Sequence, residues 1–267
     1  MEHHLLPYQN SFISYYRFGN GPKKVICFHG YGEEAASFQF FEKHAGKQFS
    51  FYSIELPFHG KTQWNNGLTF TKEDLINIVN AIAVTDETVV LIGFSLGGRI
   101  VLSLFEEIPG KVEKIILMAP DGLKVNFWYW LSTQTVIGNR LFAFTMNHPS
   151  WFFGLLKFFN RLKLVNASIL KFVRHYIDNK EVRHLLYKRW TSLRKIKPHL
   201  EKIKSLIKEN NTPVRLIYGK HDRIILTSVG EKFRKGIEGH CTIDIIHSGH
   251  QVLHEKHINE LLPALFN

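Results

Sequence analysis

A serine at position 95 stands where its hydroxyl could act as a nucleophile. The stretch Gly93-Phe94-Ser95-Leu96-Gly97 follows an apolar, β-branched run over 88–92 and precedes a helical pattern over 99–105. A sharp turn from a strand into a helix exposes a serine at a helix N-terminus, where developing negative charge is favoured. Such a turn strains the serine backbone, and flanking glycines let the strand and the helix pass closely. The pattern therefore predicts a nucleophilic Ser95.

Two further side chains could complete a hydrolytic site. Asp222 comes soon after an apolar strand-like run, and His250 follows the last run of this kind. Because the carboxyl ends of parallel strands gather at one edge of a sheet, we expect both residues there. Asp121 also follows a strand at the same edge, so it remains the alternative acid.

A glycine-rich turn follows an early strand at His29-Gly30-Tyr31-Gly32. Backbone N–H groups of such a turn can point toward an oxyanion. Loss of one oxyanion donor typically slows a hydrolase by on the order of 10²-fold or more, so this turn matters as much as the side chains.

Four runs in the chain are apolar at every position rather than at alternate positions. Strands with this pattern are buried on both faces, as in a parallel sheet covered by helices. Amphipathic segments alternate with the runs, which favours a single α/β domain carrying an insertion. The runs are 25–28, 89–92, 115–118 and 214–218.

Local signals predict several other elements. Residues 12–18 and 24–28 read as two strands joined by the turn Gly19-Asn20-Gly21-Pro22, which predicts a hairpin. Residues 34–46 predict one helix. Thr71, with an acidic residue three positions later, predicts the start of another helix.

The segment beginning at Asp121 has no strand pattern. It is dense in aromatic residues up to Phe159, and lysine and arginine then recur at helical spacing. Strand patterning returns only at Pro213. We therefore expect residues 121–204 to form a helical lid, inserted into a core built from residues 1–120 and 205–267.

The net charge of +11 is concentrated in this segment. Residues 121–210 hold 17 lysine and arginine residues against 5 acidic ones. A solvated helical face is the commonest outcome of such a charge excess. Two alternatives stay open: an acidic carrier protein and an anionic membrane surface. No nucleic-acid-binding motif accompanies the charge, so we expect no nucleic acid partner.

Other features narrow the class of protein. No run of about 18 apolar residues occurs, and the first residues do not resemble a secretory signal, so we expect a cytoplasmic protein. Cys27 and Cys241 lie in strand-like runs, which favours buried, reduced thiols. No cluster of cysteine and histidine has metal-ligand spacing, so we expect no metal.

These motifs, in this order and context, resemble those of the α/β-hydrolase fold superfamily along nearly the whole chain outside the lid. The resemblance implies a mostly parallel eight-stranded sheet flanked by helices, with an inserted helical lid. It also implies Ser95 as nucleophile, His250 as general base and then acid, and Asp222 as the residue that orients the imidazole. The oxyanion hole would be the backbone N–H groups of Tyr31 and Leu96. Supporting residues would be His29, Gly30, Gly93 and Gly97.

The pocket is expected to be apolar. Many relatives have glycine where this chain has Phe58, which would put a large apolar group near the mouth of the site. Aromatic residues of the lid would favour an acyl chain or an aromatic ring over a sugar or a nucleotide. The candidate lining residues are Phe58, Phe94, Trp128 and Trp151.

The sequence thus predicts a serine hydrolase that cleaves esters of a small to medium apolar substrate through an acyl-enzyme, without metal or organic cofactor. Within the superfamily, the motifs are similar to those of the carboxylesterases and the pimeloyl-carrier-protein methyl ester esterases. Alternatives are a thioesterase or methyl esterase acting on carrier-bound acyl groups, a C–C bond hydrolase, and a lactonase. A ligand-binding homologue that has lost catalysis is the non-enzymatic alternative.

Overall fold

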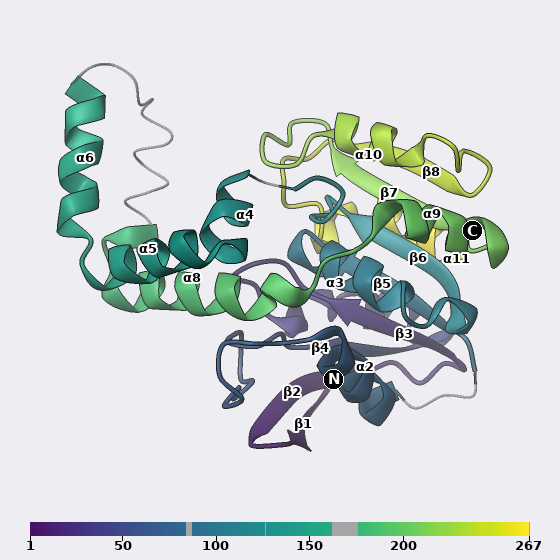
Figure 1. Cartoon of the computed structure of the whole chain (residues 1–267). Helices are drawn as coiled ribbons and strands as arrows, with labels where there is room; N and C mark the ends of the chain where they lie inside the picture. Colours follow the sequence, from purple (N-terminus) through teal and green to yellow (C-terminus); the bar gives the residue numbers. More distant parts are fainter. Residues whose placement is uncertain (84–86, 126, 162–175, 267) are drawn as a thin grey trace. The chain divides into compact units, whose positions relative to one another are not determined.

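The computed structural model describes residues 1–83, 87–125, 127–161 and 176–266 (Figure 1). The strands in these ranges form one eight-stranded sheet in the order β1-β2-β4-β3-β5-β6-β7-β8. β1 and β2 are antiparallel to their neighbours, and the other six strands are parallel. The strands are β1 (Glu2–Tyr8), β2 (Ser11–Phe18), β3 (Lys23–Phe28), β4 (Phe49–Ile54), β5 (Val89–Phe94), β6 (Val112–Met118), β7 (Val214–Gly219) and β8 (Cys241–Ile246).

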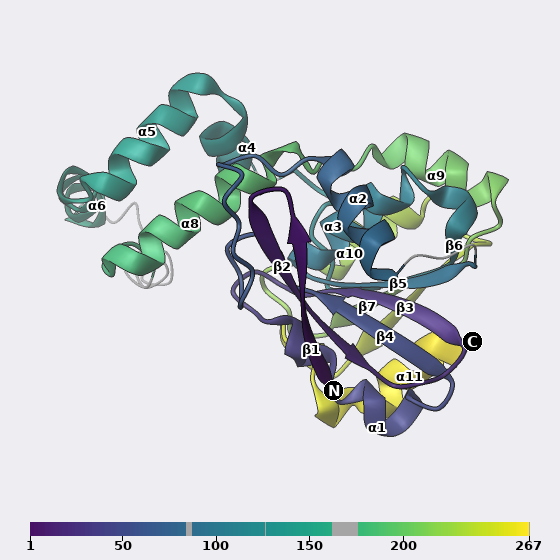
Figure 2. The same cartoon turned by 90° about the horizontal axis from the view of Figure 1, so that it is seen from below.

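Helices cover both faces of this sheet, as the fully apolar strands predict. Figure 2 shows α2 and α3 on one face and α1 and α11 on the other. The mostly parallel, helix-flanked architecture is thereby confirmed. The helices of the sheet unit are η1 (Ala35–Phe38), α1 (Phe41–Ala45), α2 (Lys72–Ala83), α3 (Leu96–Phe105), η2 (Pro109–Lys111), α9 (Leu200–Glu209), α10 (Thr227–Arg234), η4 (Glu255–His257) and α11 (Ile258–Phe266).

The core lies against the central strands. Alternate residues of β3, such as Val25 and Cys27, face a cluster that includes Phe41 of α1 and Leu265 of α11. Burial of this apolar surface is the main favourable term in folding. Cys27 and Cys241 are both free and buried, as expected, and burial raises the pKa of both thiols, that of Cys241 to about 12.

Specific polar contacts fix the helices around β5. The Thr71 hydroxyl accepts the N–H of Asp74 at 3.1 Å, and the Asp74 carboxylate accepts the N–H of Thr71 at 2.8 Å, so the predicted helix start is confirmed. Glu106, buried just after α3, accepts hydrogen bonds from Lys72 Nζ at 2.7 Å and the N–H of His199 at 3.1 Å. These contacts join α2, α3 and the start of α9.

The predicted hairpin between residues 12–18 and 24–28 is wrong. β2 pairs with β1 on one side and β4 on the other, and β3 lies between β4 and β5. Residues 19–22 connect β2 to β3, but β3 is apolar on both faces and is therefore placed in the middle of the parallel sheet. The predicted helix over 34–46 is also divided, into η1 and α1.

The chain divides into two compact units. The sheet unit contains residues 1–66, 70–124 and 195–267, and the helical unit contains residues 67–69 and 125–194. The lid expected at 121–204 overlaps most of the helical unit, but α9 belongs to the sheet unit. Residues 162–175 of the expected lid lie outside the described residues.

The helical unit is built from α4 (Phe127–Gln134), α5 (Val136–Asn147), α6 (Ser150–Arg161) and α8 (Lys180–Ser192), with η3 (Leu193–Lys195) at its end. The Phe142 ring packs on those of Tyr187 and Trp190, at centroid distances of 5.3 and 5.7 Å. Arg183 Nε donates to the carbonyl of Met146 at 2.7 Å, which joins α8 to the end of α5. Across the described part of the chain, we find no helix with the length and hydropathy needed to cross a bilayer.

Candidate active site

Ser95 lies in the tight turn between β5 and α3. Its backbone has φ 48° and ψ −113°, a left-handed conformation that side-chain-bearing residues rarely adopt. The Ser95 N–H donates to the Met118 carbonyl at 2.9 Å, and the Ser95 carbonyl accepts the N–H of Gly98 at 2.9 Å. A Cβ at position 97 would overlap the carbonyl oxygen of Phe28, so only glycine lets α3 pass this close to β3.

A chain of hydrogen bonds joins the three side chains singled out from the sequence. His250 Nε2 lies 3.0 Å from Ser95 Oγ, and His250 Nδ1 lies 2.8 Å from Asp222 Oδ2. Asp222 is buried, and its other oxygen accepts the N–H groups of Ile224 and Ile225 at 2.7 and 3.0 Å. All three residues follow the carboxyl ends of strands, namely β5, β7 and β8. The geometry matches a nucleophile, a base and an orienting acid.

Asp121, the alternative acid, lies elsewhere at this edge of the sheet. Its Oδ2 is 3.2 Å from Arg99 Nε, and its Oδ1 accepts the N–H of Gly122 at 2.8 Å. Its backbone N–H donates to the Ser95 carbonyl at 2.8 Å, in the tight turn between β5 and α3. The structure therefore gives the place beside His250 to Asp222.

The loop after β3 lies against the tight turn that carries Ser95. A Cβ at position 30 would come within 3.4 Å of the Ser95 Cβ, so Gly30 is next to the candidate nucleophile. His29 is buried, its Nε2 accepts the N–H of Leu56 at 3.1 Å, and its Nδ1 lies 2.8 Å from the Gly30 carbonyl. Because Nε2 accepts, Nδ1 carries the proton and donates to that carbonyl.

This hydrogen bond orients the peptide between Gly30 and Tyr31. The Gly30 carbonyl also accepts the N–H of Glu33 at 3.2 Å, so it is held from two sides. In a trans peptide the N–H points opposite to the carbonyl, and the Tyr31 N–H is therefore directed away from these donors. Leu96 is the first residue of α3, where N–H groups have no acceptor within the helix.

Comparison with known proteins agrees with this architecture. The family model of the alpha/beta hydrolase fold matches residues 23–257, which is most of the chain. The chain belongs to the alpha/beta hydrolase fold family. The uncharacterized hydrolase YugF of Bacillus subtilis is 24% identical to this hydrolase over 249 residues, covering 88% of this chain and 86% of YugF.

Two further comparisons concern named esterases. The pimeloyl-[acyl-carrier protein] methyl ester esterase of Nitrosospira multiformis is 30% identical over 122 residues, 42% of this chain and 44% of that protein. A thermophilic esterase from Thermogutta terrifontis superimposes with a TM-score of 0.66 at 15% identity, covering all of both chains. At this low identity, the similarity to the Thermogutta esterase shows only that the two proteins share a fold.

Glu55, which the sequence reasoning did not assign a role, supports the same loop. Its carboxylate is buried, and Oε1 accepts the N–H of Ala35 at 3.0 Å. Its Oε2 lies 3.3 Å from His29 Nε2, and a Cβ at position 60 would overlap the carboxylate. The available signal was an acidic residue directly after an apolar strand at the carboxyl edge of the sheet. In this hydrolase, Glu55 holds the far end of the loop after β3 through the Ala35 N–H, and its other oxygen lies close to His29 at the near end.

The four candidate pocket residues differ in their surroundings. Phe94 is fully buried in the core, with its ring 5.5 Å from that of His250, so it packs behind the imidazole. Phe58 has φ 62° and is half-buried. Trp128 and Trp151 belong to the helical unit and are exposed.

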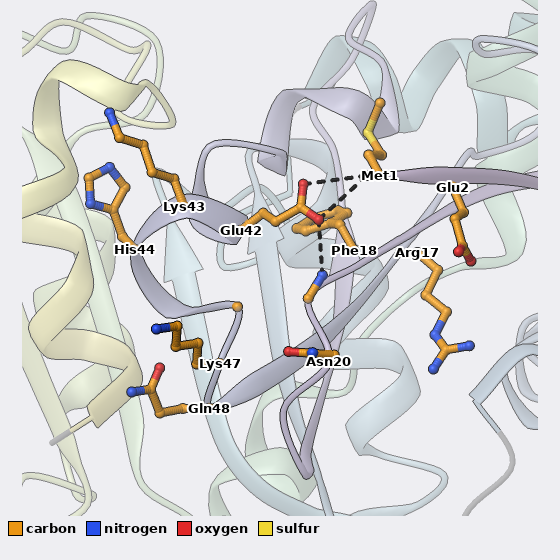
Figure 3. Close-up of a pocket in the computed structure, with 12 residues that line it drawn as sticks. Met1, Glu2, Arg17, Phe18, Asn20, Glu42, Lys43, His44, Lys47 and Gln48 are labelled. Atoms are coloured by element: carbon orange, nitrogen blue, oxygen red, sulfur yellow. Dashed lines mark hydrogen bonds and ion pairs between the residues drawn. The ribbon is translucent and has the colours of Figure 1, made fainter.

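A cavity of about 650 Å³ lies away from these residues (Figure 3). It is lined by residues from β2 and from the segment before β4, including Arg17, Glu42 and Lys47, and Glu42 lies 3.4 Å from the N-terminal amine. These segments adjoin the amino ends of β3 and β4, whereas Ser95 follows a carboxyl end. Within the described ranges, no three histidine, cysteine or acidic side chains converge as a metal site requires.

Proposed function

We propose that this protein is a serine hydrolase that cleaves carboxylic esters through an acyl-enzyme on Ser95. The observation that carries the proposal is the continuous path from Ser95 Oγ through the His250 imidazole to the buried carboxylate of Asp222. Membership of the alpha/beta hydrolase fold family and the similarity to proteins named as esterases support it.

In the first half of the reaction, Ser95 Oγ attacks the ester carbonyl carbon while His250 Nε2 takes the hydroxyl proton. Asp222 holds the Nδ1 proton and stabilises the imidazolium that forms. The tetrahedral intermediate then expels the alkoxide, which receives the proton from His250 Nε2 and leaves as an alcohol. In the second half, water gives its proton to His250 and attacks the acyl-enzyme, releasing the carboxylic acid and restoring the Ser95 hydroxyl.

The negative oxygen of the tetrahedral intermediate would be bound by the N–H groups of Tyr31 and Leu96. The first is oriented by the hydrogen bond from His29 to the Gly30 carbonyl. The second is at the N-terminus of α3, where the helix dipole also favours negative charge. Donors fixed before the reaction need no reorganisation when the charge develops, which is the main source of their effect.

A small to medium apolar ester is the substrate class we favour. The loop after β4 carries Phe58 and meets the oxyanion loop where the Leu56 N–H donates to His29 Nε2, which supports a large apolar group near the site. A methyl ester of a carrier-bound acyl chain is the second candidate. Three proteins named as pimeloyl-[acyl-carrier protein] methyl ester esterases match at 28–34% identity over about two-fifths of the chain, which favours it.

The test is hydrolysis of p-nitrophenyl esters of graded chain length by the wild type, Ser95→Ala and Ser103→Ala. Ser103 is buried in α3 and has no part in the proposed chemistry, so it is a matched control for the loss of a hydroxyl. We expect Ser95→Ala to lose turnover of every ester and Ser103→Ala to retain it. Turnover by Ser95→Ala at the wild-type rate would refute the proposal.

A further inference from the structure

One face of α5 exposes large apolar side chains. Ile137, Leu141 and Phe144 are spaced by four and seven residues, which puts them on the same side of the helix. All three are exposed, Ile137 at 80%. The opposite side of α5 carries the buried Met146 and also Phe142, whose ring packs on α8. The inward face of α5 is therefore already filled, and the apolar row faces outward.

The row continues on α6. Trp151, Leu155 and Phe158 repeat the same spacing and are exposed, and the Trp151 ring lies 6.5 Å from that of Phe144. Figure 1 shows α6 rising steeply from the end of α5 within the helical unit. We call these six residues the apolar stripe: Ile137, Leu141, Phe144, Trp151, Leu155 and Phe158. Contiguous exposed apolar surface of this kind marks an interaction site.

The charged residues on α5 and α6, the two helices that carry the apolar stripe, all have one sign. Arg140 lies between two stripe residues on α5, and Lys157 and Arg161 lie on α6. The sequence has no aspartate or glutamate between Asp121 and Asp178, while the same interval holds seven lysine and arginine residues. Two helices that carry exposed aromatic and aliphatic side chains, and whose charged residues are all cations, complement an apolar layer bordered by anions.

We propose that the helical unit binds an anionic lipid surface through the apolar stripe on α5 and α6. The tryptophan, phenylalanine and leucine side chains enter the boundary between headgroups and acyl chains, roughly 5–10 Å deep. The neighbouring lysine and arginine side chains contact anionic headgroups. Neither helix is long enough to span a bilayer, so both helices lie in the plane of the membrane interface and the protein binds reversibly.

An acidic carrier protein fits the apolar stripe and its neighbouring cations less well than a lipid surface does. Charged residues are depleted from the centre of protein interfaces, so an acidic protein surface would place its charges against six large apolar side chains. A lipid surface supplies acyl chains for the stripe and anions for the cations at the same time. This proposal is independent of the proposed function, because it uses none of Ser95, His250 and Asp222 and neither of the oxyanion donors.

The test is co-sedimentation of the full chain with vesicles. One set contains phosphatidylcholine alone and the other contains phosphatidylcholine mixed with phosphatidylglycerol. The disrupting variant is Phe144→Glu/Leu155→Glu. The matched control is Leu5→Glu/Ile245→Glu, which adds the same charge at exposed apolar positions of β1 and β8. Circular dichroism melting of both variants reports whether they remain folded.

We expect binding to the mixed vesicles that weakens at least about tenfold in the stripe variant and is retained in the control. Raising salt from 0.1 to 1 M shortens the Debye length from about 10 to about 3 Å and should release the protein. Ser95→Ala should bind vesicles like the wild type even if it has lost esterase activity. Equal binding to neutral vesicles, equal loss in the control, or binding only to an acidic carrier protein would each overturn the proposal.

Discussion

Replacing Asp222 by asparagine tests how the imidazole is held. The asparagine has the same shape, and its oxygen can still accept the N–H groups of Ile224 and Ile225. Its NH₂ group then faces His250 Nδ1 in place of the carboxylate oxygen that lies 2.8 Å away in the wild type. An NH₂ donor requires Nδ1 to be an acceptor, so the ring proton moves to Nε2.

The size of the effect follows from this change of tautomer. With a proton on Nε2, the imidazole has no lone pair toward Ser95 Oγ, 3.0 Å away, and cannot accept its proton. The wrong tautomer in a serine triad lowers kcat by about 10⁴-fold. At about 1.36 kcal/mol per factor of ten, this is about 5.4 kcal/mol of transition-state stabilisation. Because the fold contacts of Asp222 persist, the melting temperature should change little.

The assay is steady-state hydrolysis of a short p-nitrophenyl ester by Asp222→Asn and Asp121→Asn. Asp121 pairs with Arg99 at a partly exposed site, and such pairs contribute about 0–1 kcal/mol, so its variant should stay within severalfold of wild-type activity. An Asp222→Asn enzyme within tenfold of the wild type would refute the reasoning. A larger loss in Asp121→Asn than in Asp222→Asn would transfer the role to Asp121.

Two further substitutions test the surrounding structure. Glu55→Ala removes the acceptor for the Ala35 N–H, so we expect the free energy of unfolding to fall by about 1–3 kcal/mol and kcat to fall about tenfold, with little change in KM. Glu55→Gln keeps that acceptor and should restore kcat. Equal kcat in both variants would contradict the positioning role of Glu55. For Glu106, burial raises the pKa, but hydrogen bonds from Lys72 and the His199 N–H outweigh it and hold the pKa below its ordinary value of 4.5. Its stabilisation is therefore present above about pH 4.5 and is lost as pH falls through the lower folded-state pKa. Urea unfolding of Glu106→Gln should show a deficit of about 1–3 kcal/mol at pH 7 that shrinks in acid, and a deficit independent of pH would be inconsistent with this account.

Much of the fold was predictable because its signals are local. The apolar runs of β3, β5, β6 and β7 indicate a buried parallel sheet, and the glycines around Ser95 indicate a tight turn from strand to helix. Strand pairing is not local. The turn at 19–22 looks like a hairpin turn, yet β2 pairs with β1 and β4, because pairing depends on which strands are apolar on both faces.

The sequence narrowed the acid to two residues but did not choose between them on geometry. Asp121 and Asp222 both follow strands at the same edge of the sheet. Arg99, one turn into α3, forms an ion pair with the Asp121 carboxylate, and this contact depends on how α3 crosses β6. Glu55 was missed for a similar reason: its partners, His29 and Ala35, are 26 and 20 residues away and meet it only in the folded chain.

Mass spectrometry of the acyl-enzyme tests the central claim most directly. The protein is mixed with p-nitrophenyl acetate, quenched in acid during turnover, digested and mapped. Our account predicts an added acetyl group on the peptide containing Ser95, and this group forms more slowly in His250→Ala than in the wild type when samples are quenched at successive early times. An acetyl group on a different residue, or acetylation of Ser95 at the same initial rate with and without the imidazole, would contradict it.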